Sequence, residues 1–163
     1  MTADVSRRTL LGTAGALAAG AVIFGTRTFA AAPEHFEITR SPADWRRMLG
    51  AQRYRVLREA ATEPPWTSPL NDEHHKGVFK CAGCALPLYR STAKFDSGTG
   101  WPSFYAALPN AVRTSEDRSL LMVRTEVLCR RCGGHLGHVF DDGPRPTGKR
   151  YCMNGLAMTF TPA

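Results

Sequence analysis

The chain of 163 residues is long enough for one globular domain, and its 43% hydrophobic and 21% charged residues exclude a disordered protein. Its net charge of +7 permits an acidic partner, such as nucleic acid or an anionic membrane, but requires neither. Deep in the chain, no uncharged apolar stretch reaches the roughly 18 residues of a membrane helix, which excludes a polytopic membrane protein. The five cysteines are an odd number, so disulfides within the chain cannot pair all of them.

Residues 1–31 are typical of a signal peptide. Arg7 and Arg8 precede an apolar run rich in alanine and glycine, and small residues near Ala30 offer cleavage sites. The segment resembles a bacterial twin-arginine signal, which predicts export to the periplasm or another extracytoplasmic space. The alternatives are a short buried helix and an uncleaved segment that anchors the protein in the membrane. The mature chain is then one domain over residues 32–163.

The pattern of the remaining chain predicts helices first and strands afterwards. Ser41, Pro42 and Asp44 form a helix start, and Gly50 is expected to divide the following helical segment in two. After residue 77, short apolar runs separated by glycine, proline and aspartate predict strands, with a turn at 114–118. The predicted strands are Val78–Lys80, Leu86–Tyr89, Leu120–Val127, His138–Phe140 and Ala157–Phe160. The fold class is therefore mainly β, with small N-terminal helices on an antiparallel domain.

Two CxxC motifs predict a metal site. Cys81 and Cys84 form the first, and Cys129 and Cys132 form the second. Each turn directs two sulfur atoms at one centre, and together they supply the four thiolates that tetrahedral zinc prefers. Two disulfides and a thioredoxin-like dithiol are the alternatives. A thioredoxin-like motif would open a helix after a strand, and neither pair does so.

The fifth cysteine, Cys152, stands apart from both motifs and is a candidate nucleophile. Arg150 lies two residues before it and would favour the thiolate. A lone cysteine is more often an inert buried thiol, so this interpretation depends on its neighbours. His135 and His138, with Asp142 shortly after them, form a set of groups suited to proton donation. The four thiolates already complete a zinc tetrahedron, which argues against the histidines as ligands.

Five motifs in order resemble the methionine-R-sulfoxide reductases, the MsrB family. They are EPPW at 63–66, CxxC at 81–84, KFDSGTGWPSFY at 94–105, CxxC joined to GGHLGHVFDDGP at 129–144, and KRYCMNGLAMTF at 149–160. The resemblance covers about residues 38–161. It implies two small antiparallel sheets in a β-tent (Mss4-like) fold that a structural Zn²⁺ holds together.

The resemblance also implies a role for each site residue. Cys152 would attack the sulfoxide sulfur and become a sulfenic acid, while His138 protonates the oxygen and His135 assists. Asp142 would hold His138 in its tautomer and raise its pKa. Trp101 would cover the methyl group of the substrate and select the R epimer. The family motif also includes Arg150 and Asn154, on either side of the nucleophile.

The implied partners are oxidised proteins that contain methionine-R-sulfoxide and a thioredoxin-like or other thiol reductant. We expect a monomer and no nucleic acid. Many relatives have a resolving cysteine where this chain has Thr99, so either an external thiol reduces the sulfenic acid or a zinc cysteine does. A zinc-ribbon nucleic-acid module is disfavoured because the basic residues are scattered. An inactive relative would be expected to lack Cys152, a histidine or Trp101.

Overall fold

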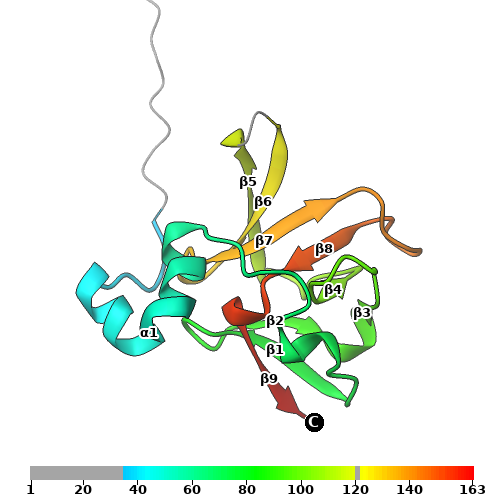
Figure 1. Cartoon of the computed structure of the whole chain (residues 1–163), viewed down its shortest axis with the longest axis horizontal. Coiled ribbons are helices and arrows are strands. Elements are labelled where there is room, and N and C mark those ends of the chain that lie inside the picture. Colours follow the sequence, from blue (N-terminus) through cyan, green and yellow to red (C-terminus); the bar gives the residue numbers. More distant parts are fainter. Residues whose placement is uncertain (1–34, 120–121) are drawn as a thin grey trace, which may run out of the picture. The chain divides into compact units, whose positions relative to one another are not determined.

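The computed structural model of the chain describes residues 35–119 and 122–163 (Figure 1). The signal segment predicted at 1–31 lies outside the described residues, as does part of the strand predicted at 120–127. No helix in the two described ranges combines the length and hydropathy that a membrane span requires.

The N-terminal helix α1 (Pro42–Glu59) begins and bends where the sequence predicts. The Ser41 side chain caps the first turn by accepting a hydrogen bond from the backbone of Asp44, and Pro42 occupies the first position. Gly50 has φ 70° and interrupts the helix, which confirms the predicted break. The helix buries one face against the β domain through Trp45, Leu49, Tyr54, Val56 and Leu57.

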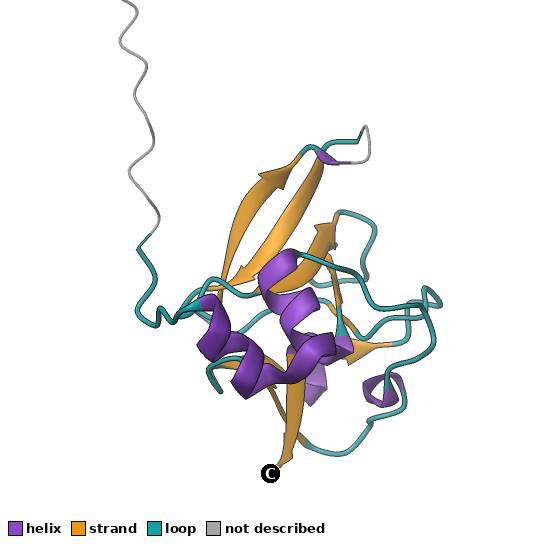
Figure 2. Cartoon of the chain, turned by 60° about the vertical axis from the view of Figure 1, so that its left-hand side comes forward, coloured by secondary structure: helices purple, strands orange, loops and turns teal. Residues whose placement is uncertain are grey.

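The strands of the described chain form two antiparallel sheets, which confirms the predicted fold class (Figure 2). The smaller sheet has the order β2 (Pro87–Arg90), β1 (Gly77–Cys81), β9 (Met158–Pro162). The larger sheet has the order β3 (Lys94–Phe95), β4 (Ser103–Phe104), β8 (Arg150–Met153), β7 (His135–Phe140), β6 (Arg124–Cys129), β5 (Val112–Asp117). Short 3-10 helices occur at η1 (Pro69–Asn71), η2 (Ser91–Ala93) and η4 (Gly155–Ala157).

Aromatic side chains from both sheets meet in the core. Phe79 of β1 and Tyr89 of β2 both contact Phe104 of β4, and all three side chains are fully buried. The Tyr89 hydroxyl donates a hydrogen bond to the sulfur of Met153, which ends β8. The core therefore supports β8, the strand that carries Cys152, from its inner side.

The turn predicted at 114–118 is wrong. Residues 112–117 form strand β5, which pairs with β6 from Val112 opposite Cys129 to Asp117 opposite Arg124. Strand β5 is an edge strand of a projecting hairpin (Figure 1) and is partly exposed along its length. Charged residues are common on such edges, so the segment lacks the apolar alternation that would identify it as a strand.

Candidate active site and metal site

Polar side chains form one row across the larger sheet. Cys152 of β8 lies directly opposite Ser103 of β4 on one side and His138 of β7 on the other. His138 in turn lies opposite Glu126 of β6. Residues that oppose each other in a sheet point to the same face. The sheet therefore places the candidate nucleophile between a hydroxyl group and an imidazole.

A register shift brings the second histidine to the same face. His135 and His138 are three residues apart, and in a regular strand this spacing would direct them to opposite faces. The pairing of β6 with β7 shifts between Val127 and Leu128, so that His135 lies opposite Leu128. The two imidazole rings lie with their centroids 5.5 Å apart. Both predicted histidines therefore belong to one site.

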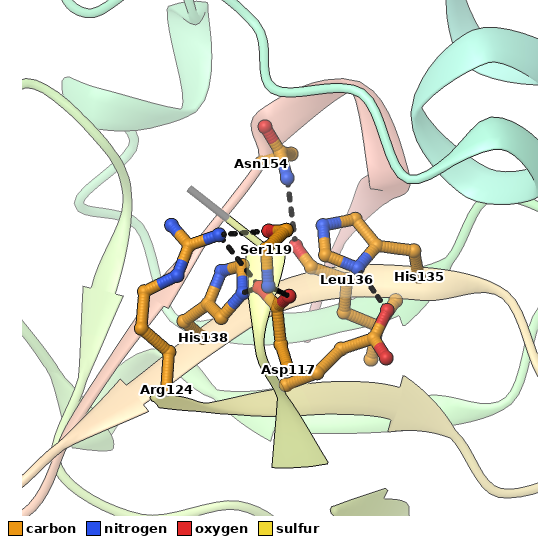
Figure 3. A network of polar contacts seen from close by, with 8 residues as sticks. Asp117, Ser119, Arg124, His135, Leu136, His138 and Asn154 are labelled. Atoms are coloured by element: carbon orange, nitrogen blue, oxygen red, sulfur yellow. Dashed lines mark hydrogen bonds and ion pairs between the residues drawn. The ribbon is translucent and has the colours of Figure 1, made fainter. Parts of the chain in front are cut away.

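His138 takes its carboxylate partner from β5. Its Nε2 atom lies 2.8 Å from Oδ2 of Asp117, and Arg124 contacts the same carboxylate oxygen at 2.6 Å (Figure 3). Hydrogen bonds from Ser119, His138 and Arg124 hold the pKa of Asp117 well below its usual range. Burial lowers the pKa of His138, the hydrogen bond with Asp117 opposes this shift, and the charge of Arg124 adds to it.

The predicted role of Asp142 toward His138 is therefore wrong. Asp142 instead forms a bidentate ion pair with Arg150, with both N···O distances at 2.8 Å. Asp142 follows the end of β7, and Arg150 pairs with Phe140 at that end, so the hairpin geometry brings the two together. The Arg150 guanidinium also lies 4.4 Å over the Phe140 ring. Hydrogen bonding to Asp142, with a smaller contribution from Cys152, raises the pKa of Arg150.

His135 is buried and has one ring nitrogen free. Its Nδ1 atom lies 2.6 Å from Oε1 of Glu126, and the residue is 3% exposed. Within the described part of the chain, its Nε2 atom has no hydrogen-bond partner (Figure 3). A buried polar atom without a partner is costly and suggests a missing ligand. His135 can therefore offer Nε2 to a polar group of a substrate while Glu126 fixes the ring.

Trp101 and Asn154 are held by the same residue, Glu63. The Trp101 indole N–H donates to the backbone carbonyl of Glu63 at 3.0 Å, and the Glu63 backbone N–H donates to Asn154 Oδ1 at 2.9 Å. The Glu63 carboxylate accepts hydrogen bonds from the backbone of Gly155 and Leu156, just after β8. Burial raises the pKa of Glu63, and these hydrogen bonds oppose the shift. Glu63 thus ties the half-buried tryptophan to the end of the nucleophile strand.

The four cysteines of the CxxC motifs form a cluster whose sulfur atoms all lie within 4.8 Å of one another. The Cys81 and Cys132 sulfurs are 3.7 Å apart, and those of Cys84 and Cys129 are 3.5 Å apart. A tetrahedron of thiolates with bonds of about 2.3 Å has edges of about 3.8 Å, so the cluster fits a metal ion. Cys152 is not part of it.

Sequence reasoning missed Asp117, Arg124, Glu126 and Glu63. The first three lie on β5 and β6, where opposite charges at paired positions, such as Asp117 opposite Arg124, would have been the available signal. Glu63 was noted only as the first residue of the EPPW motif. Its burial could not be predicted, because the hydrogen-bond partners of its carboxylate lie more than 90 positions away in the chain.

Comparison with known proteins identifies the family to which the chain belongs. A family model described as the SelR domain matches residues 49–162. The "Peptide methionine sulfoxide reductase MsrB" of Leifsonia xyli subsp. xyli is 54% identical over 129 residues, which cover 78% of this chain and 93% of that protein. The protein of the same name from Thiobacillus denitrificans is 54% identical over 124 residues, covering 76% and 94%. The Mis18 "Yippee-like" domain crystal structure has TM-score 0.45 at 22% identity, covering 55% of this chain and 98% of that one.

The comparisons define an oxidoreductase, and its candidate site has a thiol on the strand next to two carboxylate-bound imidazoles, with a separate four-cysteine cluster. The chain belongs to the SelR-domain family, the methionine-R-sulfoxide reductases known as MsrB.

Proposed function

We propose that this protein reduces methionine-R-sulfoxide in oxidised proteins to methionine, using Cys152 as the nucleophile. The observation that carries the proposal is the position of Cys152 directly opposite His138, beside a second histidine with a free buried nitrogen. The names of the relatives supply the substrate, since both are peptide methionine sulfoxide reductases.

The reaction needs a proton donor because oxide is a very poor leaving group. The Cys152 thiolate attacks the sulfoxide sulfur and forms a transient S–S bond while the oxygen takes up one proton. The hydroxyl group then migrates to the Cys152 sulfur, which breaks both the original S–O bond and the transient S–S bond. The products are Cys152 sulfenic acid and methionine, so the cysteine sulfur loses the two electrons that the substrate sulfur gains. His138 supplies the proton, and Nε2 of His135 forms a hydrogen bond with the same oxygen. Asp117 and Glu126 orient the two rings through their other nitrogens.

Arg150 and Trp101 complete the pocket. The Arg150 guanidinium, fixed by Asp142 and Phe140, attracts the negative charge of the Cys152 thiolate. Trp101 covers the methyl group of the sulfoxide and thereby selects the R epimer by shape. Glu63 fixes the indole through its backbone carbonyl, and Asn154 joins the end of β8 to β7 through the carbonyl of Leu136. A rigidly held indole is what a shape-selective site requires.

The four-cysteine cluster holds a structural zinc ion in this proposal. Cys81, Cys84, Cys129 and Cys132 would be its ligands, and the metal would supply folding free energy by joining the two sheets. A metal bound there would have no free coordination position for a substrate, because the four thiolates complete a tetrahedron. Soft thiolate donors favour zinc over magnesium or calcium.

Regeneration of Cys152 requires an external thiol. Thr99 lies 3.7 Å from the Cys152 sulfur, at the position where many relatives carry a resolving cysteine. The other four cysteines belong to the metal cluster, so the enzyme has one redox-active cysteine. A thioredoxin-like protein or another thiol would reduce the sulfenic acid directly, and we expect a monomer to suffice.

The twin-arginine pattern at residues 1–31 supports export to the periplasm in a folded state. Folding and metal loading before export would protect the four thiolates from oxidation in that compartment. An uncleaved segment would instead leave the enzyme anchored at the membrane surface.

A stereochemical assay tests the proposed function. The purified protein should consume dabsyl-methionine-R-sulfoxide with dithiothreitol and leave the S epimer intact. Cys152→Ser should abolish turnover while keeping the metal content and the thermal transition of the wild type. Turnover of both epimers at equal rates, or activity in Cys152→Ser, would overturn the proposal.

A further inference from the structure

Three hydroxyl groups form a hydrogen-bonded chain that ends at the nucleophile. The Oγ atom of Ser103, on β4, lies 2.7 Å from that of Ser97, which lies 2.8 Å from Oγ1 of Thr99. Thr99 Oγ1 lies 3.7 Å from the Cys152 sulfur, within the longer hydrogen-bonding reach of sulfur. The backbones of Ser103 and Cys152 are themselves cross-strand neighbours. The chain of hydroxyls therefore begins and ends beside the same residue.

The single hydrogen on each hydroxyl group fixes which group donates and which accepts along this row of hydroxyls. Each hydroxyl group carries one hydrogen and can donate only one hydrogen bond. Ser103 Oγ donates to the backbone carbonyl of Trp101 at 3.1 Å, because a carbonyl only accepts. Ser97 must then donate to Ser103, and Thr99 must donate to Ser97. With Cys152 in its protonated thiol form, this is the one assignment that satisfies every contact, and it leaves Thr99 with only lone pairs directed at the S–H group of Cys152.

We infer that Thr99 is a catalytic residue for the reduction of the Cys152 sulfenic acid, whose S–O–H group donates its hydrogen bond to Thr99 Oγ1. This inference rests on the proposed function, because it requires the sulfenic acid to form. A neighbour that can only accept a hydrogen bond favours the protonated sulfenic acid over the sulfenate anion, which would need donors. Thr99 therefore has a chemical role of its own, in addition to replacing the resolving cysteine of other relatives.

The protonated form is the one that an external thiol can reduce. The thiolate of the reductant attacks the Cys152 sulfur, the new S–S bond forms, and the S–O bond breaks. The hydroxide that leaves takes up a proton from solvent and becomes water. A second thiol of the reductant then attacks the mixed disulfide, forms the disulfide of the reductant and releases Cys152, which regains a proton as a free thiol. The sulfenate anion is instead a nucleophile toward peroxide and proceeds to sulfinic acid, which is not recovered by simple thiols. The hydrogen bond to Thr99 thus favours recycling over irreversible oxidation.

Three variants of the holoenzyme test this role. Thr99→Val removes the hydroxyl while keeping the branched shape, and Thr99→Ser keeps the hydroxyl as the matched control. Ser97→Ala removes the acceptor that orients the Thr99 proton, so that Thr99 can turn a donor toward the sulfur. Zinc content and the thermal transition are measured for each variant, so that a folding defect is recognised.

The two half-reactions are measured separately. One equivalent of methionine-R-sulfoxide without reductant gives the rate of methionine formation, and dimedone trapping after addition of dithiothreitol gives the rate at which sulfenic acid disappears. A neutral hydrogen bond is worth about tenfold in rate, so Thr99→Val should slow reduction about tenfold relative to methionine formation. Under hydrogen peroxide, Thr99→Val should also accumulate more Cys152 sulfinic acid by mass spectrometry. Ser97→Ala should change both readouts in the same direction, and Thr99→Ser should match the wild type.

Equal reduction rates in Thr99→Val and the wild type would overturn this inference, as would an equal slowing of both half-reactions. If Thr99→Val folds poorly, Thr99→Ser still tests the inference. This variant keeps the hydroxyl group, so slow reduction in both variants would also count against a role for that group. Failure of the wild type to form methionine would instead contradict the proposed function.

Discussion

Nε2 of His138 lies 2.8 Å from Oδ2 of Asp117, a residue 21 positions earlier on the neighbouring hairpin of the larger sheet. Asp142, only four residues after His138, is bound to Arg150 instead. His138, the proposed proton donor, and Arg150 therefore have separate carboxylates. This division lets each positive group be tested by changing a different aspartate.

Asp117→Asn should shift the pH dependence of methionine formation. The Asp117 carboxylate raises the pKa of His138 against the lowering effect of burial, so its loss lowers this pKa further. Activity that needs the imidazolium is lost as pH rises through that pKa, and the basic limb should therefore move to lower pH. The measurement is the single-turnover rate from about pH 5 to about pH 9, a range that spans the usual titration of histidine.

Asp142→Asn is the matched control for this shift. It removes a carboxylate from Arg150 and none from His138, so it should reduce the rate without moving the basic limb. A shift in Asp142→Asn, with none in Asp117→Asn, would restore the role predicted from the sequence.

Gly137→Ala should damage the site through the backbone of the nucleophile strand. A Cβ atom at Gly137 would lie 2.2 Å from the carbonyl oxygen of Cys152 and 2.9 Å from Cα of Met153, and β8 would have to move. Overpacking of this kind costs about 1–3 kcal/mol. Urea denaturation should show this loss in the free energy of unfolding, and an activity assay should show a fall in kcat.

Gly148→Ala is the control for backbone strain alone. Gly148 has φ 70° and no atom within 4 Å of an added Cβ, so this variant incurs only the strain of a left-handed residue, about 1 kcal/mol. Its kcat should remain close to that of the wild type. Equal losses of kcat in the two glycine variants would show that the contact with β8 is unimportant.

Cys81→Ser and Cys129→Ser should lose the metal and the folded state together. Cys81 ends β1 of the smaller sheet and Cys129 ends β6 of the larger one, so a metal bound by the cluster would join both sheets. A structural zinc site contributes about 10 kcal/mol or more, which matches the whole stability of a typical domain. Metal analysis and circular dichroism measure the two losses. Cys152→Ser should keep both, whereas a folded, active and metal-free Cys81→Ser would contradict the assignment.

Thr99→Cys should create a resolving thiol. The Thr99 hydroxyl already lies 3.7 Å from the Cys152 sulfur, so a thiol in its place is within reach of a disulfide. After one turnover without reductant, the mass of the variant should show the loss of two hydrogens. Its turnover should improve more with thioredoxin than with dithiothreitol, because thioredoxin exchanges readily with a disulfide. A persistent sulfenic acid in the variant would show that the two side chains cannot meet.

The sequence predicts the parts of this protein that depend on local pattern. The cap at Ser41, the break at Gly50 and the two CxxC pairs are local features, and the structure confirms the helix start, the break and the clustering of the four sulfurs. The assignment of Asp142 to His138 was wrong because it relied on closeness in the chain. The true partner depends on which strands are neighbours.

The position of His135 shows a second limit. Strand periodicity places residues three apart on opposite faces, yet the register shift at Val127 and Leu128 places both histidines on one face. Such a shift depends on the packing of two strands against each other and leaves no periodic trace in either sequence. Glu63 was missed for a related reason, since a buried glutamate is explained only by its distant backbone partners.

The central claim is that Cys152 removes the oxygen of methionine-R-sulfoxide and keeps it as a sulfenic acid. The most direct measurement is one turnover without reductant, followed by quantification of methionine and mass spectrometry of the peptide that contains Cys152. The account predicts one methionine per protein from the R epimer, none from the S epimer, and a dimedone-reactive Cys152 that gains one oxygen atom. A disulfide between Cys152 and a cysteine of the metal cluster, with release of zinc, would contradict it.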